Sequence, residues 1–169
     1  VVNYTYDDLN RVTQENYLGD AGVELRYVYD SCTYGIGQLC SAGSNSATTT
    51  YVYNSNGGID NETKNIGGTN YVNSYVYDRL GNINNLTYPD GSSVNYTFNS
   101  ANKIEKIDQK ESGGSYRSIV SNFNYGPHGM ITLQVDGNNA STTKTYDENE
   151  LYRLRNIHTS ATYPTDRKS

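Results

Sequence analysis

Aromatic and polar positions alternate in short segments along this chain, and one short phrase returns throughout. The stretch YVYDRLGNI occupies positions 75–83, and YVYNSNGGI begins 24 residues earlier. In both copies, aromatic residues stand at positions i and i+2, which share one face of a strand. Asp or Asn then opens a turn, glycine supplies positive φ, and an apolar β-branched residue begins a return segment. The phrase therefore predicts a β-hairpin.

Seven copies of the phrase align on the second aromatic residue of the pair, at intervals of 21 to 27 residues. One copy has too little apolar surface to fold alone, so neighbouring copies are expected to stack edge to edge. The paired positions predict an aromatic ladder on one face, and the seventh copy departs from it with Lys144. The ladder residues are Tyr4, Tyr6, Tyr27, Tyr29, Tyr51, Tyr53, Tyr75, Tyr77, Tyr96, Phe98, Phe123, Tyr125 and Tyr146.

Five copies carry Asn or Gly four residues after the second aromatic residue. These are the residue types that tolerate positive φ most readily, so the positions are expected to be left-handed. A β-branched residue is disfavoured there, and Gly81→Val is expected to cost more stability than Gly68→Val. The five turn positions are Asn10, Gly57, Gly81, Asn102 and Gly129.

A second turn signal lies at the far end of each copy, so each copy supplies about two strands and the chain about fourteen. The signals are LGDAG (18–22), SAGSNS (41–46), IGGTN (66–70), YPDGS (88–92), SGGSY (112–116) and DGNN (136–139). Residues 1–155 are therefore expected to form one β-sheet segment of about seven units. Residues 156–169 are expected to be a polar C-terminal tail or the start of a further strand.

Composition supports an all-β fold and limits the partners. The 169 residues include 18 Tyr, 16 Gly and 22 Asn, which favour strands and turns. The net charge of -5 does not suit nucleic acid or an anionic membrane. No apolar run approaches the ~18 residues of a membrane helix, so no membrane insertion by this segment is expected. No signal peptide is visible, and the sequence reads as part of a longer chain.

Three stretches carry a family resemblance. YTYDDLNRV (4–12), YVYDRLGNI (75–83) and YTFNSANKI (96–104) resemble the YD repeats of the bacterial Rhs family, which are shared with Tc-toxin shell subunits and with teneurins. The stretches YDSCTYGIGQLCS (29–41) and YDENELYRL (146–154) look like variants of the same repeat. The likeness covers roughly residues 4–154.

The resemblance implies a role as well as a fold. It implies a non-enzymatic segment of a hollow shell that encapsulates and protects a C-terminal toxin domain before delivery. The implied protein is bacterial and secreted or delivered to a cell surface, and its partners are the enclosed toxin domain and the neighbouring YD repeats. Some members end the shell with a self-cleavage site marked by D-P-x-G motifs, and none occurs in this sequence. No catalytic residue is carried over, and no cofactor is expected.

Other candidate chemistry is weaker. His128 lies at a turn and His158 has no Cys or His at metal-binding spacing, which argues against hydrolase and zinc sites. Asp and Asn in YDDLN (6–10) and VDGNN (135–139) could bind calcium, but Asx turns explain the same residues without a metal. Cys32 and Cys40 flank a Gly-containing insertion and could form a disulfide, remain free thiols or be part of a metal site. Two cysteines alone make a poor metal site, and we favour the disulfide slightly over free thiols.

A carbohydrate-binding or adhesive module is the alternative function. Exposed tyrosines can stack on sugars. One aromatic pair per copy at constant register is also what an internal packing ladder needs, and we favour the ladder. A buried pair would favour a shell wall, whereas a tyrosine row open to solvent would favour sugar binding.

The strand count predicts a panel and not a complete shell. Strands ~4.8 Å apart would give the chain a width of roughly 65 Å. A wall around a toxin domain of ~35 Å diameter needs on the order of 140 Å, or about thirty strands. We therefore expect repeated β-hairpins in an open, curved, spiralling antiparallel sheet. Its two unpaired edges favour edge-to-edge self-association.

Overall fold

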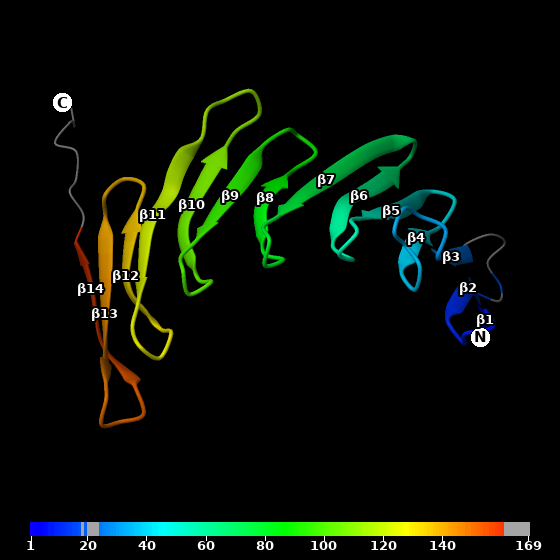
Figure 1. The fold of residues 1–169 in the computed structure, drawn as a ribbon. Coiled ribbons are helices and arrows are strands. Elements are labelled where there is room, and N and C mark those ends of the chain that lie inside the picture. The colour runs from blue at the N-terminus through cyan, green and yellow to red at the C-terminus, as the bar shows by residue number, and fades with distance from the viewer. Residues whose placement is uncertain (18, 20–23, 161–169) are drawn as a thin grey trace. The chain divides into compact units, whose positions relative to one another are not determined.

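The structure is a computed structural model that describes residues 1–17, 19 and 24–160, and Figure 1 shows its ribbon. Strands and turns make up these residues, with Tyr, Thr, Val and Ile common in the strands and Asn and Gly in the turns. The strands are β1 (Val2–Tyr6), β2 (Val12–Tyr17), β3 (Glu24–Tyr29), β4 (Leu39–Gly43), β5 (Ala47–Tyr53), β6 (Ile59–Ile66), β7 (Thr69–Tyr77), β8 (Ile83–Thr87), β9 (Ser93–Phe98), β10 (Ile104–Lys110), β11 (Arg117–Tyr125), β12 (Ile131–Asp136), β13 (Ser141–Asp147) and β14 (Arg153–Ser160).

The chain divides after Asp90 into two compact units, the first with β1 to β8 and the second with β9 to β14. Within each unit, every strand pairs antiparallel with the next strand in the chain. Among the described strands, β1 pairs only with β2 and β14 only with β13, so the sheet is open. The prediction of an all-β fold of repeated antiparallel hairpins in an open sheet is confirmed.

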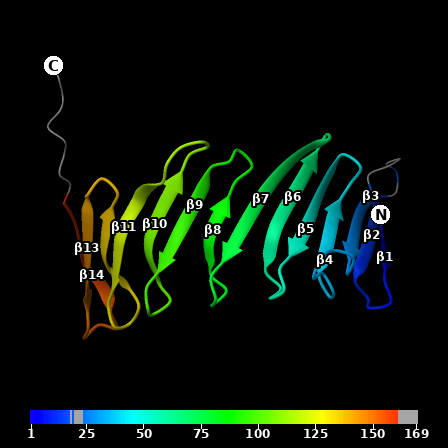
Figure 2. The same cartoon turned by 45° about the horizontal axis from the view of Figure 1, so that its top comes forward.

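A first turn closes each hairpin, and a second turn, at the opposite end of the strands, connects it to the next hairpin. In the first unit, the turns that follow the aromatic pairs lie at the lower ends of the strands in Figure 2, and the turns between β4 and β5 and between β6 and β7 lie at the upper ends. The second turn IGGTN is as tight as a hairpin allows, because only Gly67 and Gly68 lie between β6 and β7. The signal SAGSNS (41–46) is shorter as a turn than expected, because β4 continues to Gly43. Most of LGDAG (18–22) lies outside the described residues, and so do residues 161–169.

One expectation about the second turns is wrong. Gly68 was expected to tolerate valine better than Gly81, yet both have φ of +86°. A two-residue hairpin turn with positive φ at both central residues is the I′ type, and it needs glycine for the same steric reason as Gly81. The structure therefore gives no reason for Gly81→Val to cost more stability than Gly68→Val.

A β-bulge recurs at one place in all seven hairpins of the described chain. We call the residue of the second strand that pairs with the second aromatic residue the return residue. The second aromatic residue pairs with the return residue, whereas the residue before it pairs two positions further on, so one residue is skipped. A bulge of this kind strengthens local twist and re-aims side chains. The skipped residues are Thr13, Cys40, Asp60, Asn84, Glu105, Thr132 and Arg155.

Little of the described chain is fully buried. The buried apolar side chains are Cys40, Tyr53, Val120 and Ala140, with 5% to 9% of their surface exposed. Valines between the two aromatic residues of a pair point to the other face and are exposed, as Val76 is at 53%. Each unit thus has one half-buried face, and its order depends on the contacts between neighbouring strands. No helix long and apolar enough to cross a membrane occurs among the described residues.

Candidate functional site: the joint between hairpins

The residue after each aromatic pair closes the first turn with its side chain. Asp78 accepts the backbone N–H groups of Leu80 at 2.8 Å and Asn82 at 2.9 Å through Oδ1. Its own N–H donates to the Asn82 carbonyl at 2.9 Å. A short side chain that hydrogen-bonds its own turn in this way is an Asx turn. Asp7, Asn54 and Asn99 make the same pair of side-chain bonds, to the residues two and four positions later.

These bonds stabilise the charged form of the aspartates. The Asn82 side-chain amide, assisted by backbone N–H groups, lowers the pKa of Asp78. The backbone N–H of Arg11, followed by its guanidinium, lowers the pKa of Asp7. Since Asn54 and Asn99 accept the same bonds, the turn needs a side-chain oxygen at this position and not a charge.

All five predicted turn positions have positive φ. The values are 59° for Asn10, 82° for Gly57, 86° for Gly81, 58° for Asn102 and 79° for Gly129. In each of these turns, the backbone N–H of the residue donates to the carbonyl three positions earlier. The alignment of the copies predicts this conformation at these positions.

The hydroxyl of the second aromatic residue ties each hairpin to the preceding one. The Tyr77 hydroxyl donates to the carbonyl of Ile59, the return residue of the preceding hairpin, at 2.9 Å. Four further tyrosines in the described chain make the equivalent bond. They are Tyr29 to Val12 (3.0 Å), Tyr53 to Leu39 (2.7 Å), Tyr125 to Ile104 (2.6 Å) and Tyr146 to Ile131 (2.9 Å). The acceptor is a backbone atom, so no residue type in the sequence signals it.

Burial of these tyrosines differs with their place in the chain. Tyr53 is 7% exposed, and burial raises the pKa of Tyr53, Tyr77 and Tyr125. Tyr6, in the first hairpin, is 58% exposed. The interior members of the ladder are therefore half-buried to buried, because each ring lies against the preceding hairpin.

The first aromatic residues of the pairs form a second row, in which tyrosine hydroxyls donate to glutamate carboxylates. Tyr51 is paired across the strands with Glu62, and the Tyr75 hydroxyl of the next hairpin donates to Glu62 at 3.2 Å. In the same way, the Tyr27 hydroxyl of the second hairpin donates to Glu15 of the first hairpin at 2.7 Å. This hydrogen bond, together with burial, raises the pKa of Tyr27 to about 12.

The position just before the return residue contacts the second aromatic ring of the next hairpin. Arg11 lies 4.3 Å from the Tyr29 ring centre and forms an ion pair with Asp30 at 2.5 Å. Lys103 lies 5.3 Å from the Tyr125 ring centre. At Gly58 an added Cβ would stand 3.1 Å from the Tyr77 ring, which explains the second glycine of the phrase YVYNSNGGI. We call this contact, together with the hydroxyl bond and the strand pairing, the joint.

Cys32 and Cys40 are joined by a disulfide that holds a longer first turn. Here the return residue is Leu39, and Asp30 closes the loop by accepting the Gly37 N–H at 2.6 Å. Gly35 is buried against the disulfide, and an added Cβ there would lie 2.8 Å from the Cys40 sulfur and closer still to the Cys32 sulfur. The sequence left disulfide and free thiols open, and it gave no sign of this close approach.

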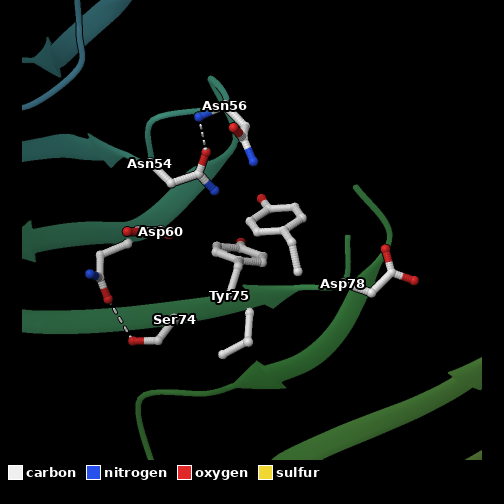
Figure 3. Close-up of a pocket in the computed structure, with 9 residues that line it drawn as sticks. Asn54, Asn56, Asp60, Ser74, Tyr75 and Asp78 are labelled. Carbon is white, nitrogen blue, oxygen red and sulfur yellow. Dashed lines mark hydrogen bonds between the residues drawn. The ribbon is translucent and has the colours of Figure 1, made fainter. Parts of the chain in front are cut away.

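An open groove lies beside the tyrosine row in the first unit (Figure 3). It has a volume of about 480 Å³ and is lined by Asn54, Asn56, Asp60, Asn61, Ser74, Tyr75, Val76, Tyr77 and Asp78. Part of its polar lining is already bonded, since Ser74 donates to Asn61 at 2.6 Å and Asn54 accepts from Asn56 at 2.9 Å. The groove combines aromatic rings with amides and carboxylates, a composition that suits a small polar ligand.

His128 lines an open pocket of about 360 Å³ in the second unit, together with Glu148 and Tyr152. His128 is exposed at its turn and stacks on Tyr152, with ring centres 3.7 Å apart, and His158 lies in strand β14. In the part of the chain that the structure describes, no group of three or more His, Cys, Asp or Glu is placed to hold a metal. Asp7, one of the calcium candidates, already accepts two backbone N–H groups and the Arg11 guanidinium.

Comparison with known proteins identifies the fold. No protein-family model matches the sequence, and no curated protein is significantly similar to it. Among solved structures, the chain is similar to TcdB2-TccC3 with Cdc42 (TM-score 0.80, 15% identity), covering 94% of this chain and 9% of that chain. It is also similar to the Photorhabdus luminescens Tc holotoxin pore (TM-score 0.79, 15% identity), covering 95% of this chain and 9% of that chain.

A third similar structure is TcdB2-TccC3 without its hypervariable C-terminal region, with a TM-score of 0.81, 15% identity and coverage of 94% of this chain and 9% of that chain. This chain thus spans about 9% of the length of the chains that it resembles. Similarity across nearly all of this chain shows that it shares its fold with a part of these Tc toxin structures.

Proposed function

We propose that this chain is a non-enzymatic wall segment of an Rhs-type shell that encapsulates and protects a C-terminal toxin domain before delivery. The observation that carries the proposal is the joint. Turn carboxylates and amides bond to their own backbone, and tyrosine hydroxyls bond to the backbone of the preceding hairpin. The polar side chains thus form hydrogen bonds that hold the strands of the sheet together, which suits a structural wall segment.

Because the polar groups of such a wall already have hydrogen-bond partners, the wall offers few groups that can bind other molecules. A bare sheet offers backbone donors and acceptors to other chains, whereas a hydrogen-bonded interior strand does not. Bonded hydroxyls and turn carboxylates are also unavailable to a flexible cargo. A domain kept beside this surface would therefore find few groups with which to form stable non-native contacts.

Size argues for neighbours in a longer protein. A toxin domain of ~35 Å diameter needs a wall on the order of 140 Å, or about thirty strands at ~4.8 Å spacing. The described residues supply fourteen strands. Further YD repeats would continue the wall, in agreement with the small share of the similar chains that this sequence spans.

The disulfide supports a secreted or surface-exposed location for the protein. Disulfides persist in secreted and surface-exposed proteins and are rare in reducing compartments. Cys32–Cys40 closes a loop that includes a glycine buried against the sulfurs. We propose a bacterial protein that is secreted or delivered to a cell surface, with the neighbouring YD repeats and the enclosed toxin domain as its partners.

Protease protection of the cargo tests the proposal. In the parent protein, the C-terminal domain should resist a protease that digests the same domain when it is expressed alone. Deleting the hairpin of β7 and β8 (residues 69–87) should open the wall and expose the domain to the protease. The control variant with Asn56→Ser and Arg79→Ser, both in turns, should leave the domain protected. A C-terminal domain that is digested equally fast in the intact parent would overturn the encapsulation role.

The groove favours carbohydrate binding as the second candidate. Tyr75 supplies an aromatic ring, and Asn56 and Asp60 supply polar groups near it (Figure 3). Saturable binding of a defined sugar on a glycan array, abolished by Tyr75→Ala and retained by Tyr71→Ala, would favour this function over the wall. The half-buried ladder with bonded hydroxyls is the reason that we place it second.

A further inference from the structure

The pocket beside His128 lies at the joint between the last two hairpins of the second unit, those of β11–β12 and β13–β14. Its lining residues come from 126–132 in the first of these hairpins and from 144–152 in the second. Strands β12 and β13 pair directly, so both walls belong to one hydrogen-bonded unit (Figure 1). None of the described lining residues lies on β14, the strand at which a following repeat would pair. The walls of the pocket therefore do not depend on where the sheet ends.

Two departures from the repeat open this pocket. Gly126 stands directly after an aromatic pair, where all six other hairpins have Asp or Asn. An added Cβ at Gly126 would lie 3.3 Å from the Thr132 side chain, which also lines the pocket, so a larger residue would occupy this space. On the neighbouring hairpin, Lys144 stands where all six other hairpins have the first aromatic residue of the pair. A flexible cation thus replaces a ring on one side, and a side chain is missing on the other.

A third departure supplies an aromatic wall. The first turn of the last hairpin is two residues longer than that of the preceding hairpin, because the return residue follows the second aromatic residue by eight positions (146 to 154) and not by six (125 to 131). The longer turn places Leu151 and Tyr152 at φ of 55° and 56°, a conformation that bulky residues rarely adopt. Tyr152 thereby stacks on His128 of the preceding hairpin, with ring centres 3.7 Å apart. Backbone strain of this kind is common at binding sites.

The walls suit a flat apolar group. Met130 and Tyr146 line the pocket together with the stacked rings of His128 and Tyr152. Aromatic faces accept a further ring by offset or edge-to-face packing, and a thioether makes favourable contacts with a ring edge. The volume of about 360 Å³ is near the lower limit of small-molecule sites, which are roughly 300–1,000 Å³. The pocket therefore has room for one or two fused rings.

Two charged side chains line the same pocket, and they differ in exposure. Lys144 is half-buried, and its ammonium has no hydrogen bond or ion pair within the described part of the chain. A cation that is partly removed from water and lacks a partner favours an anion beside it. Glu148 has the opposite charge, but it is exposed, so water and salt screen it. The pocket therefore favours a negative group attached to an apolar ring.

We propose that this pocket binds a small aromatic carboxylate, a molecule of one or two fused rings with a carboxylate on a short chain. The ring packs on Met130 and Tyr146, and the carboxylate forms an ion pair with Lys144. The stacked rings of His128 and Tyr152 close one side of the pocket. Binding is non-covalent and leaves the ligand unchanged. The inference rests on the pocket and not on encapsulation, so either can fail alone.

NMR titration of the chain with labelled methionine and histidine tests the proposal. Met130 is the only methionine in the sequence, so its methyl group gives a single signal. Phenylacetate and indole-3-acetate should shift this signal and those of the His128 ring to saturation, with a dissociation constant on the order of 1 mM. His158, in β14 and outside the pocket, is the internal control and should not shift. No saturable shift of Met130 with either acid at concentrations on the order of 10 mM would overturn the proposal.

Charge variants test the ion pair. Lys144→Gln should weaken phenylacetate binding about fivefold or more, and Glu148→Gln should leave it equal or up to about twofold tighter. Lys64→Gln, which removes an exposed lysine in the first unit, is the matched control and should bind normally. Phenethylamine, which carries a positive charge in place of the carboxylate, should bind more weakly than phenylacetate. Tighter binding of the amine, or phenylacetate binding that Lys144→Gln leaves unchanged, would overturn the proposal.

Two variants that restore the repeat separate the pocket from the fold. Gly126→Asn puts back the turn side chain, and Lys144→Tyr puts back the aromatic residue. Lys144→Tyr should keep the circular dichroism spectrum and melting temperature, because tyrosine stands at this position in other hairpins. Both variants should lose the saturable shift of Met130, and if Gly126→Asn does not fold, Lys144→Tyr alone decides. A folded Lys144→Tyr variant that binds phenylacetate as the unaltered chain does would overturn the proposal.

Discussion

Removing one hydroxyl from the joint should loosen two hairpins without disturbing the aromatic ladder. Tyr77→Phe deletes the bond from the Tyr77 hydroxyl to the Ile59 carbonyl, which is 2.9 Å long, and keeps the ring. A neutral hydrogen bond of this kind contributes about 1 kcal/mol. Because a repeat sheet holds together through nearest-neighbour contacts, the loss should fall on the joint between this hairpin and the preceding one. Phe98 shows that the ladder accepts phenylalanine at this position.

Hydrogen exchange measured on the native protein can locate this loss. A change of about 1 kcal/mol raises the opening equilibrium roughly fivefold, so amides of β6 and β7 should exchange about five times faster. Tyr71→Phe is the matched control, since Tyr71 is 46% exposed and the structure shows no hydrogen bond for its hydroxyl. Equal exchange rates in the two variants would refute the claim that the hydroxyl ties the hairpins together.

Three further substitutions test the turns, the carboxylate row and the disulfide loop. Asp78→Ala should lower the denaturant midpoint of unfolding, because the N–H groups of Leu80 and Asn82 lose their acceptor. Asp78→Asn should lose much less, as Asn54 and Asn99 make the same turn, and a loss equal to that of alanine would contradict the Asx-turn assignment. The pKa of Tyr27 is raised to about 12, so its protonated hydroxyl stabilises the fold below pH 10. This stability is lost as the pH rises from about 10 to about 12. The free energies of unfolding measured at pH 9 and pH 11.5 should therefore differ less for Tyr27→Phe than for the unaltered chain. Gly35→Ala should lower the melting temperature or prevent the disulfide, whereas Gly114→Ala should be milder, because the nearest atom to its Cβ is the Glu111 carbonyl oxygen at 3.3 Å. A normal disulfide and melting temperature in Gly35→Ala would contradict the close packing around Gly35.

Hairpins and first turns were predictable because their signals are local. The aromatic pair, the Asx residue and a residue suited to positive φ lie within seven positions, and each acts on its own backbone. Gly81 and Asn102 could therefore be placed in the left-handed region from the sequence alone. The same local reasoning misjudged Gly68, because the length of a hairpin connection decides the conformation there and the sequence did not fix where β6 ends.

The bulges and the joint were not predictable, because they depend on neighbours far along the chain. Nothing in the sequence marks Asp60 as the residue that the register skips. The Tyr77 hydroxyl bonds to a backbone carbonyl 18 positions earlier, and any residue offers a carbonyl. Gly58 must be small because a ring from the next hairpin lies against it. Sequence reasoning thus found the repeated element and missed how one copy binds the next.

Tyrosine burial also depended on structure more than on pattern. The aromatic pairs were expected to be either buried, as in a wall, or open, as in a sugar-binding surface. The ladder includes both Tyr53 at 7% exposure and Tyr6 at 58%. A sheet with one half-buried face leaves part of most rings in water, as at Tyr29 and Tyr77, and Tyr53 is buried more deeply than these.

The most direct test of the shell proposal is a cryo-electron microscopy structure of the complete parent protein. Our account predicts that the hairpins of residues 1–160 form part of the wall of a hollow shell. Density for a separate C-terminal domain should lie inside that shell. Hairpins that instead form an open surface, with every other domain outside and accessible to solvent, would contradict the account.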